Sequence, residues 1–317
     1  MALVEVKNLK KYFETPSGLL HAVDDVSIDI EAGTTVGIVG ESGCGKSTLG
    51  KLMIRMLEKT DGEISFDGKE ITEMSLKDFN HMRMQMQMIF QDPFSSLDPR
   101  MTVKSLIAEP IKTYKLEKNK KDLDEKVNEL MGVVGLAQRL ENSYPHELDG
   151  GRRQRIGIAR ALSLNPDFIV CDEPVSALDV SIQAQILNLL MDLQQEKDLT
   201  YVFITHDLSV VKHISDEICV MYLGQIVEKC KTDKLFSRTL HPYSQALLAA
   251  IPEPTIHGKK ESILLKGEVT SPIEPKRNCR FSSRCKYAID KCFEEEPEYR
   301  EYEEGHFVKC HRVEEIN

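Results

Sequence analysis

A glycine-rich segment near residue 40 carries the residue types that bind phosphate. Residues 40–47 read GESGCGKS and fit the pattern G-x-x-x-x-G-K-[ST]. Glycines let successive backbone N–H groups point at phosphate oxygens, and the N-terminus of a following helix adds its positive end. Lys46 would reach the β- and γ-phosphates of a nucleotide, while the Ser47 hydroxyl would coordinate Mg²⁺. The residues expected to contact the nucleotide are Gly40, Ser42, Gly43, Cys44, Gly45, Lys46, Ser47 and Thr48.

Two acidic residues follow a short apolar run at 168–171. Asp172 is suited to hold Mg²⁺, usually through water, and Glu173 can accept a proton from an attacking water. An acidic pair after a strand is, taken alone, more often a helix N-cap or a solvated edge. Together with the glycine loop, the pair favours a catalytic role.

Three short apolar segments are expected to position these residues. Residues 34–39 predict a strand ending at Gly40, and residues from Ser47 onward have helical spacing of apolar side chains. Further buried strands are predicted at 168–171 and at 201–205, the latter ending at His206. Polar groups at the carboxyl ends of such strands are where open sheets place ligands, so the fold class is α/β.

Composition limits the classes of function. The 317 residues include 41 Lys+Arg and 51 Asp+Glu, a formal charge of −10, which argues against a nucleic-acid partner. No apolar stretch approaches the roughly 18 residues that cross a bilayer, and the first residues lack the apolar segment of a signal peptide. We therefore expect a cytoplasmic protein unless a partner holds it at a membrane.

The chain is expected to have a large domain and an appendage. Residues 101–147 contain repeated helical patterns without a convincing strand, which predicts a helical subdomain inserted at about 95–160. After about Val227 proline becomes frequent and the last residues are acidic. The predicted domains are residues 1–230 and a C-terminal extension at 231–317.

Further motifs, in order, resemble those of ATP-binding cassette (ABC) ATPases. Residues 148–162 (LDGGRRQRIGIARAL) resemble the signature motif, 172–174 (DEP) the Walker B motif, 176–179 (SALD) the D-loop and 205–207 (THD) the H-loop. Gln91 matches the Q-loop. Phe13 matches the aromatic residue that stacks on adenine, with Tyr12 as the alternative one position away. The resemblance covers roughly residues 4–230.

This resemblance implies a P-loop NTPase fold, ATP and Mg²⁺ as ligands, and a dimer. Gln91 would touch Mg²⁺ or the lytic water, and His206 would contact the γ-phosphate. Asp179 would lie at the interface of two domains closed head to tail, so that each ATP meets the partner's signature motif. The implied Mg²⁺ contacts are Ser47, Gln91 and Asp172; the implied signature contacts to the partner's ATP are Asp149, Gly150 and Gly151.

The signature motif departs from the usual L-S-G-G-Q at Asp149 and Arg152. A serine hydroxyl donates to the γ-phosphate, whereas an ionised aspartate cannot donate and repels it. We therefore expect a weakened site for the partner's ATP and a heterodimer with an ATPase whose signature is intact; an active homodimer is the opposing prediction. Asp149 is also an excellent N-cap, and as a cap it would turn away from the ligand.

Four cysteines near the C-terminus are spaced C-x5-C-x6-C-x17-C, and four thiolates suit either a [4Fe–4S] cluster or tetrahedral zinc. Arg280 and Arg284 would stabilise a cluster's negative charge or lie in solvent, and His306 and His311 are predicted at the surface. The segment HPYSQALL from residue 241, with these cysteines, resembles the extension of ATPases that drive dipeptide, oligopeptide and nickel importers. That resemblance favours the iron–sulfur cluster. The cysteines are Cys279, Cys285, Cys292 and Cys310.

The family resemblance implies an ATP-hydrolysing subunit of a peptide importer, with a nickel importer as the alternative. Its partners would be a second ABC ATPase, two membrane-spanning permease subunits and, indirectly, an extracytoplasmic solute-binding protein. The chain would then lie on the cytoplasmic face of the cell membrane. A non-transport ABC ATPase acting on ribosomes or DNA, and an inactive regulatory subunit, are further hypotheses, which the single cassette and the intact Lys46 and Glu173 disfavour.

Overall fold

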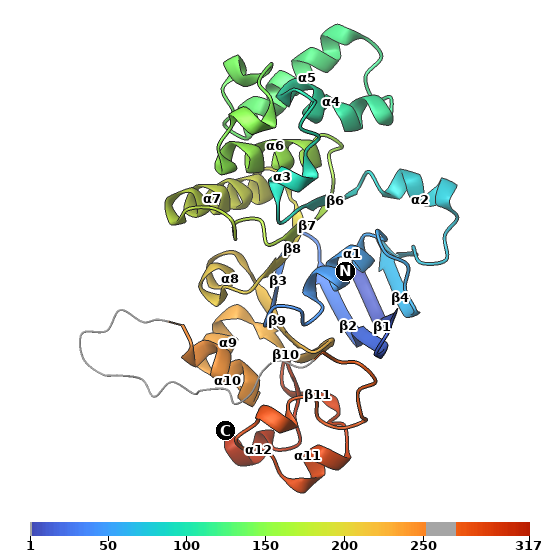
Figure 1. The fold of residues 1–317 in the computed structure, drawn as a ribbon, viewed down its shortest axis with the longest axis vertical. Coiled ribbons are helices and arrows are strands. Elements are labelled where there is room, and N and C mark those ends of the chain that lie inside the picture. The colour runs from blue at the N-terminus through green and yellow to red at the C-terminus, as the bar shows by residue number, and fades with distance from the viewer. Residues whose placement is uncertain (1, 252–270) are drawn as a thin grey trace, which may run out of the picture. The chain divides into compact units, whose positions relative to one another are not determined.

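The computed structural model describes residues 2–251 and 271–317, so part of the predicted extension, at 252–270, lies outside the described residues. The chain divides into two compact units (Figure 1). The first unit is Met1–Glu73 with Phe203–Asn317, and the second is Met74–Val202. The predicted boundary between residues 230 and 231 lies within the first unit and stays a prediction.

One sheet of the first unit is antiparallel, with strand order β2-β1-β4-β5. Along β2 the buried Val26, Ile28 and Ile30 alternate with exposed residues, as expected for a sheet with one covered face. Register shifts interrupt the β1–β2 pairing, and the sequence analysis did not predict this sheet. The strands are β1 (Ala2–Thr15), β2 (Gly18–Glu31), β4 (Asp61–Phe66) and β5 (Lys69–Glu70).

Five more strands of this unit lie in the order β11-β12-β10-β9-β3. β3 is buried along its whole length and pairs in parallel with β9, whereas the other pairs are antiparallel. The strands are β3 (Thr35–Val39), β9 (Glu217–Tyr222), β10 (Gln225–Lys231), β11 (Tyr299–Glu303) and β12 (His306–Lys309). The first residues of β8 (Thr200–Thr205) belong to the second unit and its last residues to the first. The predicted strands at 34–39 and 201–205 are thus confirmed to within one residue.

Helices of the first unit are short. They are α1 (Lys46–Met53), α8 (Leu208–Ile214), α9 (Thr232–Ser237), α10 (Pro242–Ala249), α11 (Asp290–Glu294) and α12 (Val313–Ile316), with a 3-10 turn η3 (Ser282–Arg284). α1 follows the glycine loop, so the predicted strand–loop–helix order is confirmed.

Buried hydrogen bonds to Glu228 attach the C-terminal region to β10. The Glu228 carboxylate accepts hydrogen bonds from the backbone N–H groups of Leu240 and His241, at 2.7 and 3.1 Å, and lies 2.8 Å from Nε2 of His306. Glu228 and His306 are both 0% exposed. The prediction that His306 lies at the surface is therefore wrong, because its ring is used to satisfy a buried carboxylate.

The second unit contains the parallel pair β6 (Met86–Ile89) and β7 (Phe168–Asp172) and is otherwise helical. Its region 101–147 holds helices and 3-10 turns and no strand, as predicted. Thr102 and Asn119 cap α4 and α5 with their side chains, which explains where these helices begin. The helices are α2 (Leu76–Met82), α3 (Pro93–Ser96), α4 (Val103–Thr113), α5 (Lys120–Val133), α6 (Gly150–Leu162) and α7 (Val180–Lys197), with turns η1 (Gln138–Leu140) and η2 (Pro145–Glu147).

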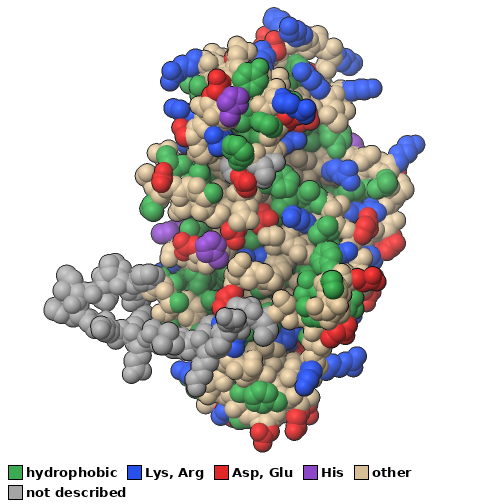
Figure 2. All heavy atoms as spheres, in the orientation of Figure 1, with side chains coloured by type: hydrophobic (Ala, Val, Ile, Leu, Met, Phe, Trp, Pro, Cys, Tyr) green, Lys and Arg blue, Asp and Glu red, His purple; other side chains and the backbone are tan. Residues whose placement is uncertain are grey.

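Within the described residues, no helix has the length and apolarity required to cross a membrane. Acidic and basic side chains are interspersed over the face drawn in Figure 2.

Candidate nucleotide site and cysteine cavity

The glycine loop between β3 and α1 needs glycine for steric reasons. Gly40, Gly43 and Gly45 have φ values of 154°, 77° and 106°. A Cβ atom on Gly40 would lie 2.1 Å from the carbonyl oxygen of Met221, and one on Gly45 would lie 2.0 Å from that of Ala22. The sequence pattern therefore reflects a backbone that other residues could not adopt in this position.

Lys46 is the first residue of α1 and is 5% exposed. Its Nζ donates to the carbonyl oxygens of Gly40 and Glu41 at 2.8 and 3.0 Å, so the loop wraps around the ammonium group. Ser47 follows in the same helical turn. Burial raises the pKa of the Cys44 thiol, so Cys44 stays neutral near pH 7.

The two candidate adenine-stacking residues have different surroundings on β1. The Tyr12 ring stacks on His21 with a centroid distance of 3.9 Å, and its hydroxyl donates to Asp24. The Phe13 ring has the Lys11 ammonium 4.9 Å from its centroid. One face of the Tyr12 ring and its hydroxyl are thus already in contact with other residues of the protein.

In the second unit, the structure brings Gln91 and Glu173 together. Nε2 of Gln91 donates to Oε2 of Glu173 at 3.0 Å. Glu173 has a φ of 45°, in the left-handed region that non-glycine residues rarely adopt, and such strain is concentrated at functional sites. Asp172, at the end of β7, is 4% exposed.

The signature-motif residues begin α6, and Asp149 is its N-cap. Oδ1 of Asp149 accepts from the backbone N–H of Arg152 at 2.8 Å, and Oδ2 lies 3.1 Å from Nη1 of the same arginine. Gly150 and Gly151 form the first turn, and a Cβ on Gly151 would lie 2.6 Å from the Ile182 side chain. The capping geometry expected of Asp149 is therefore present. Arg152 lies in the first turn of the helix.

Two further predicted residues lie at helix starts. His206 follows the last residue of β8 and is exposed, and the next residue, Asp207, caps α8 through a 2.8 Å bond from the Ser209 N–H. Asp179 precedes α7 and makes no side-chain cap bond. The glycine loop and His206 belong to the first unit, whereas Gln91 and the acidic and signature motifs belong to the second.

The sequence analysis missed two contacts to Glu41, the second residue of the glycine loop. Its backbone N–H donates to the Tyr243 hydroxyl at 2.9 Å, and its carboxylate is bound by Arg284 at 2.6 and 2.9 Å. These partners lie 202 and 243 residues further along the chain, so no local pattern indicates them.

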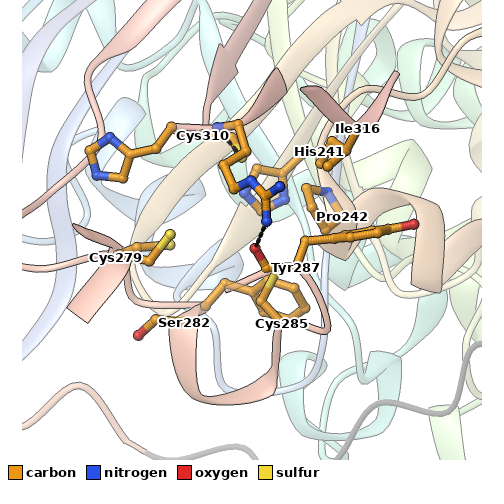
Figure 3. A pocket seen from close by; sticks show the side chains of 12 residues that line it. His241, Pro242, Cys279, Ser282, Cys285, Tyr287, Cys310 and Ile316 are labelled. Carbon is orange, nitrogen blue, oxygen red and sulfur yellow. Dashed lines mark hydrogen bonds between the residues drawn. The ribbon is translucent and has the colours of Figure 1, made fainter. Parts of the chain in front are cut away.

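All four C-terminal cysteines line one small cavity, together with His241, His311 and Arg312 (Figure 3). Burial, together with the neighbouring cysteines, raises the pKa of the Cys279 thiol to about 12 and that of Cys310 to about 11. The thiols are therefore protonated near neutral pH unless a cation stabilises the thiolates.

The predicted metal site at these cysteines lacks support from the geometry. Throughout residues 2–251 and 271–317, no three His, Cys, Asp or Glu side chains are arranged to hold a metal ion. Arg280 and Arg284, which adjoin Cys279 and Cys285, are each 7% exposed at the side chain and so do not lie in solvent. They bind Asp24 and Glu41 respectively.

Comparison with known proteins gives two family matches. Residues 23–176 match the family described as ABC transporter, and residues 227–292 match the oligopeptide/dipeptide transporter C-terminal region. A solved dimer of the ATP-binding cassette MJ0796, in a post-hydrolysis state bound to ADP and Pi, is similar with a TM-score of 0.67 and 29% identity. The similarity covers 72% of this chain and 98% of that chain.

Two Bacillus subtilis proteins are similar over almost the whole length. The oligopeptide transport ATP-binding protein AppF is 50% identical, with 98% of this chain and 97% of AppF covered. The oligopeptide transport ATP-binding protein OppF is 49% identical with the same coverage. This chain belongs to the ABC transporter ATPases, in the family of the oligopeptide transport ATP-binding proteins.

Proposed function

We propose that this chain hydrolyses ATP to power an ABC importer for dipeptides or oligopeptides. The observation that carries the proposal is the near-complete match to AppF, which includes the C-terminal region as well as the cassette. A cassette match alone is common to transporters of many solutes. The matched C-terminal region is described as that of oligopeptide/dipeptide transporters and AppF as an oligopeptide transport protein, which supports peptides over nickel as the solute.

The roles of the site residues follow from their chemistry. Lys46 binds the β- and γ-phosphates, the loop N–H groups from Gly40 to Thr48 hold phosphate oxygens, and His206 contacts the γ-phosphate. Mg²⁺, when bound by Ser47, Asp172 and Gln91, neutralises charge on the phosphates. Phe13 stacks on adenine, because Tyr12 is occupied by His21 and Asp24.

Glu173 is the general base that takes a proton from the attacking water. The 3.0 Å bond from the Gln91 amide supports this role, because an amide donor orients the carboxylate. Gln91 would therefore act on the base as well as on Mg²⁺. Gln91 follows β6. In this proposal it conveys to the permease whether a nucleotide is bound.

We further propose that the chain pairs head to tail with a second ATPase whose signature motif is intact. Asp149, Gly150 and Gly151 would face the partner's ATP, and Asp179 would lie at the interface. A negatively charged Asp149 would weaken that site, which favours a heterodimer over a homodimer. Two permease subunits would hold the pair at the cytoplasmic face of the membrane and receive peptide from a solute-binding protein.

The four cysteines of the cavity remain our candidates for a [4Fe–4S] cluster, with zinc as the alternative. The support is the donor set: four thiols from Cys279 to Cys310 line one cavity. The cluster would stabilise as thiolates Cys279 and Cys310, whose pKa burial raises.

Peptide uptake by cells that depend on this chain tests the function. Cells expressing the wild-type chain should accumulate a labelled oligopeptide, whereas cells expressing Lys46→Ala or Glu173→Gln should not. Glu125→Gln, an exposed glutamate on α5, is the matched control and should support normal uptake. Uptake of nickel instead of peptide would favour the nickel importer, and an ATPase rate stimulated by RNA or DNA would favour a non-transport role.

A further inference from the structure

Glu41 connects the glycine loop to the C-terminal region at both backbone and side chain. Its N–H donates to Oη of Tyr243, on α10, at 2.9 Å. Its carboxylate receives two bonds from the Arg284 guanidinium: Nη1 to Oε2 at 2.6 Å and Nη2 to Oε1 at 2.9 Å. The loop conformation is thus held by residues outside the motif that defines it.

The Arg284–Glu41 pair is shielded and its geometry is specific. The Arg284 side chain is 7% exposed and that of Glu41 is 24% exposed. The guanidinium also lies 5.8 Å from the ring centroid of Tyr222, which packs edge-on against Phe281. The guanidinium is thus in contact with an aromatic ring as well as with the carboxylate, and a lysine could not reproduce the two parallel bonds.

The charge of Glu41 matters for phosphate binding. Its carbonyl oxygen accepts from Nζ of Lys46, the residue expected to reach the β- and γ-phosphates. An unpaired carboxylate in this loop would repel a nucleotide's phosphates and leave the loop backbone less constrained. The Arg284 guanidinium reduces the repulsion, because it neutralises the carboxylate. It also constrains the loop, because it fixes the direction of the Glu41 side chain.

We propose that Arg284 is a positioning residue of the ATP site, acting through Glu41 to keep the glycine loop in its phosphate-binding shape and to neutralise its carboxylate. The proposal rests on the proposed function, since it assumes that the loop binds MgATP. According to this proposal, a residue of the C-terminal region supports the chain's own nucleotide site. Arg280 makes a parallel connection, because it binds Asp24, which also accepts from Tyr12.

The test measures MgATP affinity and steady-state ATPase kinetics on the full-length protein. Arg284→Ala should raise the Kd and KM for MgATP about tenfold or more while kcat changes less than about threefold. Arg284→Lys should recover part of the affinity, because it keeps the charge and loses the paired bonds. The control is Arg238→Ala, which breaks an exposed arginine–glutamate pair of the same region and should bind MgATP as the wild type does.

A double variant separates the charge of Glu41 from its pairing with Arg284. Replacing Glu41 by Gln in the Arg284→Ala background removes the unpaired carboxylate and should restore the part of the affinity that was lost through repulsion of the phosphates. Thermal melting in the absence of nucleotide identifies variants that fail to fold. If Arg284→Ala does not fold, the nearly isosteric variant Glu41→Gln replaces it. Glu41→Gln should bind MgATP more weakly than the wild type.

Three results would contradict the reasoning. Unchanged MgATP affinity in Arg284→Ala would show that the loop does not depend on the pair, and a double variant no better than Arg284→Ala would exclude the charge argument. A wild-type protein that binds no MgATP would overturn the proposed function and this inference with it.

Discussion

Asp149 can be tested for its two roles separately, because its cap and its charge respond to different substitutions. As the N-cap of α6, its Oδ1 accepts the Arg152 N–H at 2.8 Å. Asp149→Ala removes the cap and should destabilise the protein by about 1 kcal/mol. Asp149→Asn and Asp149→Ser keep a capping oxygen. Because the Asp149–Arg152 ion pair is 60% and 47% exposed, losing it should cost under about 1 kcal/mol.

The charge of Asp149 should matter for ATP at a dimer interface. Two like charges about 4 Å apart repel by roughly 4 kcal/mol at an effective dielectric constant near 20. If Arg152 offsets about two thirds of this repulsion, the remainder of about 1.4 kcal/mol still corresponds to a factor of about ten. Both Asp149→Ser and Asp149→Asn remove the charge, but only serine also supplies a hydroxyl donor.

The assay combines thermal melting with the ATPase rate of the chain purified alone. We expect a slow wild-type rate, a roughly tenfold or greater increase for Asp149→Ser, and a smaller increase for Asp149→Asn. Asp149→Ala should melt about 2–4 °C lower than the wild type, and the capped variants should not. A fast wild-type rate that Asp149→Ser leaves unchanged would refute the weakened site, and equal melting of all four proteins would refute the cap.

Three further predictions concern the remaining site residues. Glu173→Gln should reduce the ATPase rate about 10²- to 10⁴-fold while MgATP binding, measured by equilibrium dialysis, is retained. Phe13→Ala should weaken MgATP binding by about 1–3 kcal/mol in a fluorescence titration, whereas Tyr12→Phe, which keeps the ring, should bind as tightly as the wild type. Protein purified without oxygen should contain iron and acid-labile sulfide in near-equal amounts, and both should be lost in the double variant Cys279→Ser, Cys285→Ser; zinc or no metal would contradict the cluster.

The elements that carry the nucleotide motifs could be predicted because their signals are local. The run at 35–39 has no polar side chain after Thr35 and is buried over its whole length. The predicted strands at 168–171 and 201–205 likewise match β7 and β8 to within one residue. Each is short and mostly apolar and is followed by residues for which we propose a chemical role.

The antiparallel sheet of the first unit could not be predicted in the same way. The β1–β2 pairing has register shifts at four places, so the two-residue alternation of side chains along β1 is broken. Exposed residues at 7 and 8 separate the buried Val6 from Leu9. A pattern search that requires regular alternation does not find such a strand.

The contacts of Glu41 show a second limit, which is distance along the chain. Arg284 lies 243 residues after Glu41, next to a cysteine whose spacing suggests metal chemistry. Read from the sequence, that arginine was assigned to a cluster or to solvent. The fold instead uses it on the glycine loop, because η3 brings residue 284 to the loop while Cys285 lines the cavity.

Contacts between residues far apart in the sequence also explain how the acidic C-terminal region folds against the rest of the first unit. Leu240, Val308 and Val313 form a small apolar cluster there, and Leu235, Tyr243 and Phe281 join the larger core that contains Val39 and Val220. β12 pairs with β10, and the fully buried Glu228 of β10 is satisfied by the Leu240 and His241 N–H groups and by His306. A buried carboxylate without partners is strongly unfavourable, so β10 and the C-terminal region stabilise each other. Because Arg284 belongs to this region, the shape of the glycine loop depends on the residues that follow β10.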